Sequence, residues 1–285
     1  MSITTLPAPR DATGTLAPAL DAAERLLTGR RVAVLTGAGV STDSGIPDYR
    51  GAGAVHRTPM NFAVFLGDEQ ARKRYWAGSH LGWNHFSAAH PNMGHLALAE
   101  LEAAGVVTGI VTQNVDGLHA RAGSRRVVEL HGAMRRVTCL TCGQTFARAD
   151  IAARMTRENP WLGYPEAVQT GPDGDVQIDY VDQMIVPSCT VCGGVLKPDV
   201  VFFGEFVPPT VFAAARAILR GAEALVIAGS SLVVNSGIRL LDQAVKARMP
   251  VVVVNRGETR GDRRASLKID AGTSEVLAGL AARLR

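Results

Sequence analysis

The chain has no long apolar run and no strong excess of charge of one sign. No window of its 285 residues approaches the ~18 consecutive apolar residues of a membrane-spanning helix, so we expect no membrane partner. Lys and Arg number 30 against 26 Asp and Glu, and the net charge of +4 is not concentrated in one stretch. Since nucleic-acid binding relies on a concentrated basic surface, direct nucleic-acid binding is not expected.

The N-terminus lacks the features of a targeting segment. The first residues, MSITTLPAPRDATGTLAPAL, contain no charged start followed by an apolar core, as a secretory signal would. They also contain few Arg for an organellar transit peptide. We expect residues 1–15 to form a loosely ordered tail and the protein to be cytoplasmic.

Cysteine is scarce, but its four copies are arranged in two C-x-x-C pairs. Without an export signal, such pairs indicate a reducing compartment and metal binding rather than disulfides. Two pairs can place four thiolates on one tetrahedral ion, which leaves no open position for catalysis. The pattern therefore predicts one structural zinc ion, whereas a redox dithiol, the alternative, would need only one pair. The predicted ligands are Cys139, Cys142, Cys189 and Cys192.

Apolar runs alternate with amphipathic helical patterns along most of the chain. The runs are uninterrupted, which is typical of parallel strands with helices on both faces. This alternation predicts an α/β fold with a Rossmann-like parallel sheet. The expected strands are Val32–Thr36, Val106–Thr112, Val127–Leu130, Leu225–Ala228, Val251–Asn255 and Leu267–Ile269. The expected helices are Ala17–Leu27, Met93–Ala104, Thr210–Arg220 and Gly237–Ala247, the last capped by Ser236.

Two regions interrupt this alternation. Residues 51–92 are rich in Arg, Trp, His and Gly and show helical spacing but no strand, and residues 133–195 hold the cysteine pairs and a turn-rich stretch. Insertions of this kind often form a second, smaller domain, and the cleft between the two domains is a natural ligand site. We therefore predict a large Rossmann-like domain of residues 16–50, 93–132 and 196–285, with a smaller zinc-binding and helical domain inserted into it.

A glycine turn follows the first expected strand. Glycine at Gly37 and Gly39 lets the backbone approach a phosphate, and a following helix capped by Ser41 would supply N–H donors. However, Thr42 replaces the third glycine of G-x-G-x-x-G, and residues 55–60 hold neither the strand nor the acid of a dehydrogenase. The turn favours nucleotide binding over an ordinary tight turn, and it argues against a hydride-transfer enzyme.

Polar side chains follow two further strands. Gln113, Asn114 and Asp116 stand beyond the second strand, where open α/β folds bind ligands. They suit a carboxamide and sugar hydroxyls, and an Asx-type turn that caps the next helix is an equal alternative. His131 ends the third strand and is the best candidate for a general base, because its ordinary pKa of about 6.5 shifts readily. We expect His119 to be structural.

The stretch LKPDVVFFGE at 196–205 predicts a strand flanked by Pro198 and a hinge at Gly204. One interpretation is a plain buried strand. The other is a strand at the edge of a cleft that pairs with an extended peptide, with Phe202 or Phe203 as the wall for a substrate side chain.

A second strand–glycine–helix pattern occurs at 228–237, in AGSSLVVNSG. It favours phosphate contacts from Gly229, Ser230 and Ser231, and Asn255 ends the next strand, within reach of a ribose.

Taken in chain order, these segments resemble the sirtuin family of NAD-dependent protein deacylases. GAGVSTDSGIPDYR, TQNVDGLH, ELHG, the cysteine pairs, LKPDVVFFGE and GSSLVVNS occur in the family's order between about Leu26 and Leu280. The segments most similar to the class II branch are RYW at 74–76, GSRRVVELHG at 123–132, PDGDV at 172–176 and LKPDVVFFGE at 196–205. The resemblance implies a lysine deacylase that acts on acylated-lysine proteins, with NAD as co-substrate and one structural zinc.

The resemblance also implies a role for each matching position. His131 would be the catalytic base, and Asn114 would assist it by orienting the ribose. The implied NAD site comprises Gly37, Ala38, Gly39, Ser41, Asp48, Tyr49, Arg50, Arg57, Gln113, Asn114, Val115, Asp116, Gly229, Ser230, Ser231, Asn255, Arg256, Gly257 and Thr273. The implied substrate-binding residues are Val201, Phe202, Phe203, Gly204 and Glu205.

The implied reaction uses no enzyme nucleophile. The acyl-lysine carbonyl oxygen attacks C1′ of the nicotinamide ribose and displaces nicotinamide. His131 then deprotonates a ribose hydroxyl, so that the acyl group migrates and lysine, nicotinamide and an O-acyl-ADP-ribose are formed. Asn114 and Asp116 would align the ribose and the carboxamide, which supplies much of the rate.

The acyl preference depends on Tyr75 and Gly78. Relatives that remove succinyl groups carry Arg three residues after the Tyr, and Gly78 at this position disfavours an acidic acyl chain. Besides a deacetylase, the resemblance leaves open a longer-chain or lipoyl-type deacylase with weak deacetylase activity. Two other classes stay open: a protein mono-ADP-ribosyltransferase, and a non-catalytic NAD or nucleic-acid sensor built on the zinc module.

Overall fold

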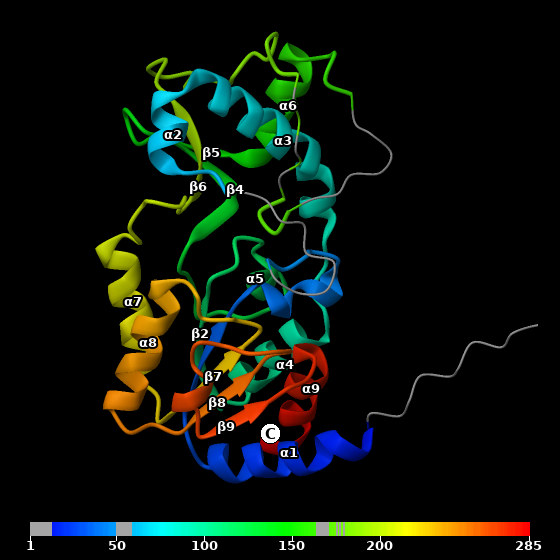
Figure 1. The fold of residues 1–285 in the computed structure, drawn as a ribbon, viewed down its shortest axis with the longest axis vertical. Helices are drawn as coiled ribbons and strands as arrows, with labels where there is room; N and C mark the ends of the chain where they lie inside the picture. The colour runs from blue at the N-terminus through cyan, green and yellow to red at the C-terminus, as the bar shows by residue number, and fades with distance from the viewer. Residues whose placement is uncertain (1–12, 50–58, 164–170, 175, 177, 179) are drawn as a thin grey trace, which may run out of the picture.

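The fold contains two β-sheets. The structure is a computed structural model that describes residues 13–49, 59–163, 171–174, 176, 178 and 180–285. The six-stranded and the three-stranded sheet lie toward opposite ends of the molecule (Figure 1). The long helix α3 (Glu69–Ala88) runs between the two ends. The expected α/β fold class is confirmed, whereas the domain boundaries stay a prediction.

The six-stranded sheet is wholly parallel, with the strand order β3-β2-β1-β7-β8-β9. Strands β1, β7 and β8 are buried at every position, as expected when helices cover both faces. The order reverses between β1 and β7, and doubly wound sheets bind ligands at this point. The strands are β1 Val32–Thr36, β2 Val107–Thr112, β3 Val127–Glu129, β7 Ala224–Ala228, β8 Val251–Val254 and β9 Leu267–Ile269.

Alternate side chains of the central strands enter two separate cores. Val32 and Val34 pack with α1, α4 and α9 on one face, whereas Ala33 and Leu35 pack with α7 and α8 on the other. Full burial of each Val or Leu side chain contributes about 1.5–3 kcal/mol. The helices are α1 Thr13–Leu27, α4 Met93–Ala103, α7 Pro209–Arg220, α8 Asn235–Lys246 and α9 Thr273–Leu284.

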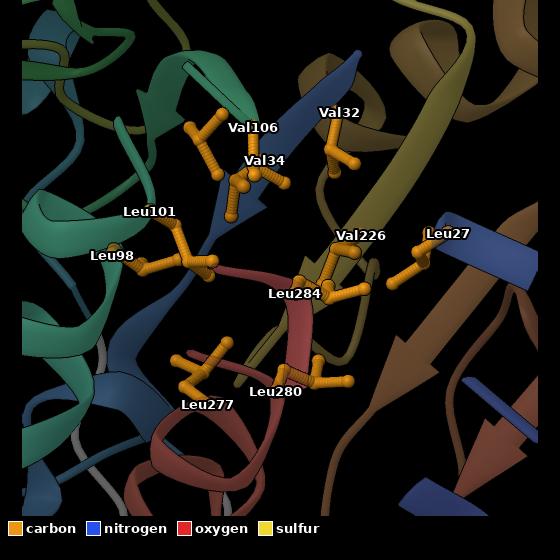
Figure 2. Close-up of a pocket in the computed structure, with 11 residues that line it drawn as sticks. Leu27, Val32, Val34, Leu98, Leu101, Val106, Val226, Leu277, Leu280 and Leu284 are labelled. Atoms are coloured by element: carbon orange, nitrogen blue, oxygen red, sulfur yellow. The ribbon is translucent and has the colours of Figure 1, made fainter. Parts of the chain in front are cut away.

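A small apolar void remains inside the first of these cores. Its volume is about 10 Å³, and Figure 2 shows leucine and valine side chains gathered around it. A void of this size holds at most about one water molecule, and none of its lining side chains is polar. We therefore regard it as a packing gap and not as a ligand site.

The three-stranded sheet is antiparallel, with the order β5-β4-β6, so β6 is an edge strand. Its core includes Phe65, Trp76 and Met155, none of which has exposed surface. No helix among the described residues is long and apolar enough to cross a membrane. The elements of this part are β4 Gly132–Cys139, β5 Thr145–Ala147, β6 Leu196–Val200, α2 Phe62–Gly67 and α6 Arg148–Glu158, with the short helix α5 Leu118–Arg121 beside the large sheet.

Three local expectations are wrong. Residues 13–15 belong to helix α1, whose Leu16 and Leu20 pack on the core, and not to a loose tail; residues 1–12 lie outside the described residues. Ser236 does not cap α8, because the helix begins one residue earlier and the Ser236 hydroxyl bonds to the His131 side chain. The strand expected over 196–205 ends at Val200, after which the chain turns.

Candidate active site

The polar residues predicted from the sequence lie at one edge of the six-stranded sheet, where its parallel strands end together. Thr36, the last residue of β1, is in register with Thr112 of β2 and Ala228 of β7. The turns that follow these strands therefore begin side by side. The first residues beyond β1, β2, β7 and β8 are Gly37, Gln113, Gly229 and Asn255, and His131 is the second residue beyond β3.

The glycine turns after β1 and β7 are in direct contact. The N–H of Gly39 donates to the Gly229 carbonyl at 2.9 Å. A Cβ on Gly37 would lie 2.7 Å from the Gly229 oxygen, and one on Gly39 would lie 2.8 Å from the Gly229 Cα. Glycine is therefore required at both positions for the packing of the two turns. Ala38, which lies between the two glycines, begins a 3₁₀ turn. The approach of these turns to a phosphate stays a prediction.

Ser41, Asn114 and Asp116 form one hydrogen-bonded group. Ser41 Oγ donates to Asp116 Oδ2 at 2.7 Å and accepts from Asn114 Nδ2 at 3.0 Å. The Leu118 N–H donates to the other oxygen of Asp116 at 2.8 Å. Burial raises the pKa of the Asp116 carboxyl, and these donors oppose the shift by stabilising the carboxylate. The expectation that Ser41 caps a helix is wrong, because its hydroxyl is committed to this group.

His131 is held by hydrogen bonds at both ring nitrogens. Nδ1 lies 3.0 Å from the Gln113 carbonyl oxygen, which can only accept, so Nδ1 carries the proton. Nε2 is therefore the basic nitrogen, and it lies 2.9 Å from Ser236 Oγ. Burial lowers the pKa of His131 to about 4, so the ring is neutral at neutral pH. This is the state that a general base requires.

His119, which the sequence predicts to be structural, is buried beneath the site. Its Nε2 lies 2.9 Å from Thr36 Oγ1, and its ring packs against His95 with the ring centroids 4.7 Å apart. Burial and the neighbouring His95 lower the pKa of His119 well below the usual value.

Gln113 joins the turn after β2 to the turn after β7. Its side-chain oxygen accepts from Ser230 Oγ at 2.6 Å, and its backbone N–H donates to the Thr36 carbonyl at 2.9 Å. Because the Gln113 carbonyl also holds His131, the orientation of the His131 ring depends on these Gln113 contacts. Val115 is buried, and its carbonyl accepts from the N–H of Met134.

The turn after β8 is held by two side chains that donate to its backbone carbonyls. Asn255 Nδ2 donates to the Arg256 carbonyl at 2.6 Å, and Lys268 Nζ donates to the carbonyls of Asn255 and Gly257 at 2.6 and 2.9 Å. Lys268 thereby shapes this turn, a role that the sequence analysis missed. The Ser231 carbonyl nearby accepts from the Arg260 N–H.

Thr273 lies beside the first glycine turn. As the first residue of α9, it is buried, and its Oγ1 donates to the Gly39 carbonyl at 3.0 Å. The hydroxyl therefore fixes the turn in place, and the proximity of Thr273 to an adenine stays a prediction.

The segment after Ser41 reaches across to the turn-rich insert. Tyr49 Oη donates to Asp173 Oδ1 at 2.7 Å, and Asp48 is half-buried next to it. Arg50 and Arg57, which the resemblance implies for the NAD site, lie outside the described residues.

Some backbone groups of the predicted substrate segment already form hydrogen bonds with other parts of the chain. The backbone of Phe203 pairs with residues 60–62, through bonds of 2.9 and 3.3 Å, and the Val201 N–H donates to the His131 carbonyl at 2.9 Å. Phe202 is buried against Phe65 and Tyr75, whereas Phe203 is 48% exposed. Of the two phenylalanines, only Phe203 offers its ring to a ligand.

A buried ion pair closes this segment into a turn around Gly204, whose φ is +87°. Lys197 Nζ lies 3.0 Å from Glu205 Oε2, which also accepts from the Phe202 N–H at 2.6 Å. The Lys197 ammonium packs over the Phe202 ring, 4.5 Å from its centroid. Burial lowers the pKa of Lys197, and Glu205 opposes the shift. Glu205 is therefore committed to the turn.

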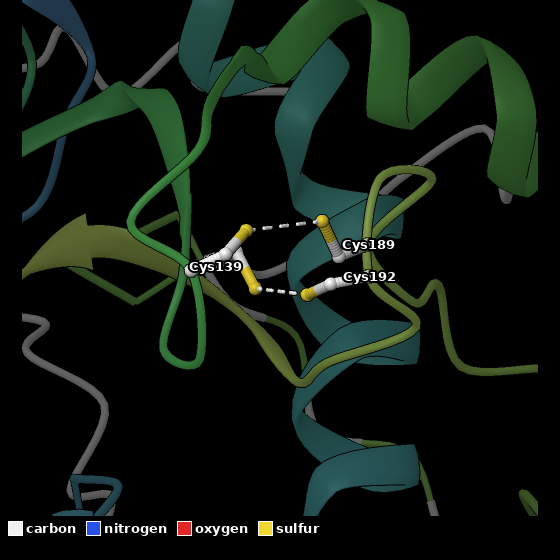
Figure 3. A group of neighbouring side chains, drawn as sticks. Cys139, Cys189 and Cys192 are labelled. Atoms are coloured by element: carbon white, nitrogen blue, oxygen red, sulfur yellow. Dashed lines mark hydrogen bonds between the residues drawn. The ribbon is translucent and has the colours of Figure 1, made fainter.

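The four cysteines gather at one end of the small sheet (Figure 3). Their Sγ atoms all lie within 4.8 Å of one another, and two of the pairs are 3.5 and 3.8 Å apart. The two C-x-x-C turns have the same backbone pattern: Gly143 and Gly193 donate to the first cysteine's carbonyl and have φ near +73°. Four thiolates this close fit one tetrahedral zinc ion, with Zn–S bonds of about 2.3 Å.

The donor set at the strand ends fits a nicotinamide nucleotide. Amide, carboxylate and hydroxyl groups of Gln113, Asn114, Asp116 and Ser41 converge on one edge of the sheet beside a neutral imidazole. These groups can bond to ribose hydroxyls and to a carboxamide. Sequence reasoning missed Ser236 as a partner of His131, since its spacing suggested only a helix cap.

Comparisons with known proteins agree with one another. The model of the Sir2 family matches residues 37–236. Proteins named NAD-dependent protein deacetylase 1 from Mycobacterium avium (strain 104) and from Streptomyces coelicolor are 50% and 49% identical over 260 and 273 residues, which cover 90% and 94% of this chain and 92% and 90% of theirs. A solved structure of Sir2 with p53 peptide and NAD+ has a TM-score of 0.74 at 30% identity and covers 90% of this chain and 95% of that one.

Proposed function

The chain belongs to the Sir2 family, and we propose that it is an NAD-dependent protein lysine deacetylase of the sirtuin type. It transfers the acyl group of a modified lysine to ADP-ribose and releases nicotinamide. NAD, when bound, supplies the ribose that receives the acyl group and the nicotinamide that leaves. The chain's own residues bind and orient the two substrates and accept one proton.

The state of His131 is the observation that carries this proposal. Its proton is fixed on Nδ1 by the Gln113 carbonyl, so Nε2 is the nitrogen that accepts a proton from a ribose hydroxyl. Burial keeps the ring neutral at neutral pH, with a pKa of about 4.

Asn114 and Asp116 orient the ribose and the carboxamide in this proposal. Both are joined to Ser41, so the group is rigid before a ligand arrives. Since the chain supplies no nucleophile for the proposed transfer, alignment of the acyl oxygen with the ribose carries much of the rate.

The surroundings of Gly78 favour an uncharged acyl group. A Cβ at Gly78 would lie 2.0 Å from the Val176 carbonyl oxygen, and the Val176 N–H donates to the Gly78 carbonyl at 3.1 Å. An arginine that could bind an acidic acyl chain therefore does not fit here unless Val176 moves. The adjacent Tyr75 packs edge-on against Phe65 and Phe202, which makes this wall aromatic.

The zinc ion has a structural role in this proposal, because four cysteines fill its coordination sphere. The ligands are Cys139, Cys142, Cys189 and Cys192. We place the enzyme in the cytoplasm, where thiols stay reduced, and assign it protein substrates rather than nucleic acid.

Nicotinamide release from NAD tests the proposal. We expect release only when an acetyl-lysine peptide is present, less or none with a succinyl-lysine peptide, and formation of O-acetyl-ADP-ribose in equal amount. Transfer of labelled ADP-ribose to protein without any acyl-lysine would indicate a mono-ADP-ribosyltransferase instead. NAD binding without turnover on acetyl, lipoyl or long-chain acyl peptides would contradict an enzymatic role.

A further inference from the structure

Ser236 is the second partner of the base, and no part of the predicted site includes it. It lies in the first turn of α8, is buried, and places its Oγ 2.9 Å from His131 Nε2. The two residues are 105 positions apart in the chain. A serine near the start of a helix ordinarily bonds to a backbone N–H of the first turn, whereas this helix has no side-chain cap.

The hydrogen-bond directions around His131 are fixed by the partners. The Gln113 carbonyl accepts from Nδ1–H, so Nε2 carries only a lone pair and the Ser236 hydroxyl donates to it. The ring is therefore held at both ends in one orientation and one tautomer. Without the hydroxyl, the Gln113 bond alone would hold the ring.

We propose that Ser236 is a positioning residue for the transfer step: its hydroxyl holds the His131 ring with the lone pair of Nε2 aimed at the site until a ribose hydroxyl takes its place. In that step the ribose O–H bond breaks, the Nε2–H bond forms, and the ribose oxygen is left to attack the acyl carbon. Ser236 gives up one hydrogen bond and loses no proton. This role rests on the proposed deacetylase function.

The position of α8 makes Ser236 suited to this role. Gly237, the next residue, packs closely on the site: a Cβ there would lie 3.2 Å from the Gln113 side-chain nitrogen and 3.1 Å from Leu232. The helix start is therefore pressed against the strand ends that carry Gln113 and His131. This packing places the Ser236 hydroxyl within hydrogen-bond distance of His131 Nε2, at 2.9 Å.

The step order separates a positioning role from a structural one. Nicotinamide leaves before His131 acts, so exchange of labelled nicotinamide into NAD, driven by an acetyl-lysine peptide, does not need the base. We expect Ser236→Ala to lower net deacetylation by ~3- to 10-fold, the effect of losing one uncharged hydrogen bond, with exchange and the KM for NAD unchanged. Ser236→Thr keeps the hydroxyl and restores turnover, and Asn235→Ala, an exposed neighbour, serves as the control.

Nitrogen NMR of the His131 ring provides a readout independent of activity. The free protein is expected to show a protonated Nδ1 and a hydrogen-bonded Nε2 at neutral pH, and Ser236→Ala should shift the Nε2 resonance alone. Parallel loss of exchange and deacetylation, or an unchanged turnover and Nε2 resonance, would overturn the proposal. Absence of nicotinamide release by the native enzyme, with the Nε2 shift intact, would contradict the deacetylase function and leave the Ser236–His131 contact supported.

Discussion

The polar site at the edge of the six-stranded sheet draws its residues from five strand ends and a helix start. The cysteine cluster draws all of its ligands from two similar turns. The first is tied together by hydrogen bonds within the chain, such as those from Ser41 to Asp116 and from Ser236 to His131. The second consists of four sulfur atoms within 4.8 Å that have few other partners. The strand-end site is therefore assembled by hydrogen bonds within the chain, whereas we expect the small sheet to depend on its ion.

Removal of zinc should produce the largest difference in stability between the two regions. Structural zinc contributes about 10–16 kcal/mol of apparent binding free energy in small zinc modules, so Cys142→Ser should cost the small sheet its stable fold. Hydrogen exchange is expected to show lost protection in β4–β6 and retained protection in β1, β7 and β8.

The control for this prediction is Val191→Ala, a 67% exposed residue between two ligands, which should keep one zinc per chain. A Cys142→Ser protein with full protection in β4–β6, or a native protein without zinc, would show that the ion is dispensable.

Acid should weaken the strand-end region through its buried histidines. Burial lowers the pKa of His95 and His131 to about 4, below the ordinary 6.5, so the unfolded chain binds more protons between these values. The stabilisation from the two neutral histidines is therefore fully present above about pH 6.5. As the pH drops toward 4, the free energy of unfolding falls by about 1.4 kcal/mol per pH unit for each histidine. Urea unfolding between pH 7 and 5 measures this slope.

The variant His95→Gln distinguishes the effect of His95 protonation on stability from the effect of zinc loss in acid. Glutamine suits this third position of α4, where His95 Nδ1 now accepts from the Asn92 N–H in a capping box. The variant should keep the helix start and show a smaller slope. An unchanged slope would mean that His95 does not titrate below its unfolded value.

A smaller effect is expected where the two glycine turns meet. Gly39→Ala places a Cβ 2.8 Å from the Gly229 Cα, and such overpacking costs about 1–3 kcal/mol. Gly67→Ala in α2, where no atom lies within 4 Å of the added Cβ, is the matched control. Thermal unfolding should show a lower Tm for the first only, and equal Tm values would refute the close contact.

The same contrast explains what the sequence could predict. The cysteine cluster follows from two local C-x-x-C patterns, and the common strand edge follows from uninterrupted apolar runs that end in polar residues. The role of Ser41 was not predictable, because its partner Asp116 lies 75 residues away and a cap was the local explanation. Ser236 was missed for the same reason, since its partner is set by how α8 packs on the strand ends.

The substrate segment shows a further limit of local patterns. LKPDVVFFGE predicts one long strand, but Lys197 and Glu205 pair with each other and bend the chain after Val200. The pairing of Phe203 with residues 60–62 joins segments about 140 positions apart, for which neither sequence contains a signal.

Formation of O-acetyl-ADP-ribose from NAD and an acetyl-lysine peptide, measured in His131→Ala, tests the central claim most directly. The account predicts that the native enzyme forms O-acetyl-ADP-ribose and that the variant loses about 10²- to 10⁴-fold of this activity, the usual contribution of a general base, while it still folds and binds NAD. Undiminished deacetylation by a folded His131→Ala protein would contradict the account.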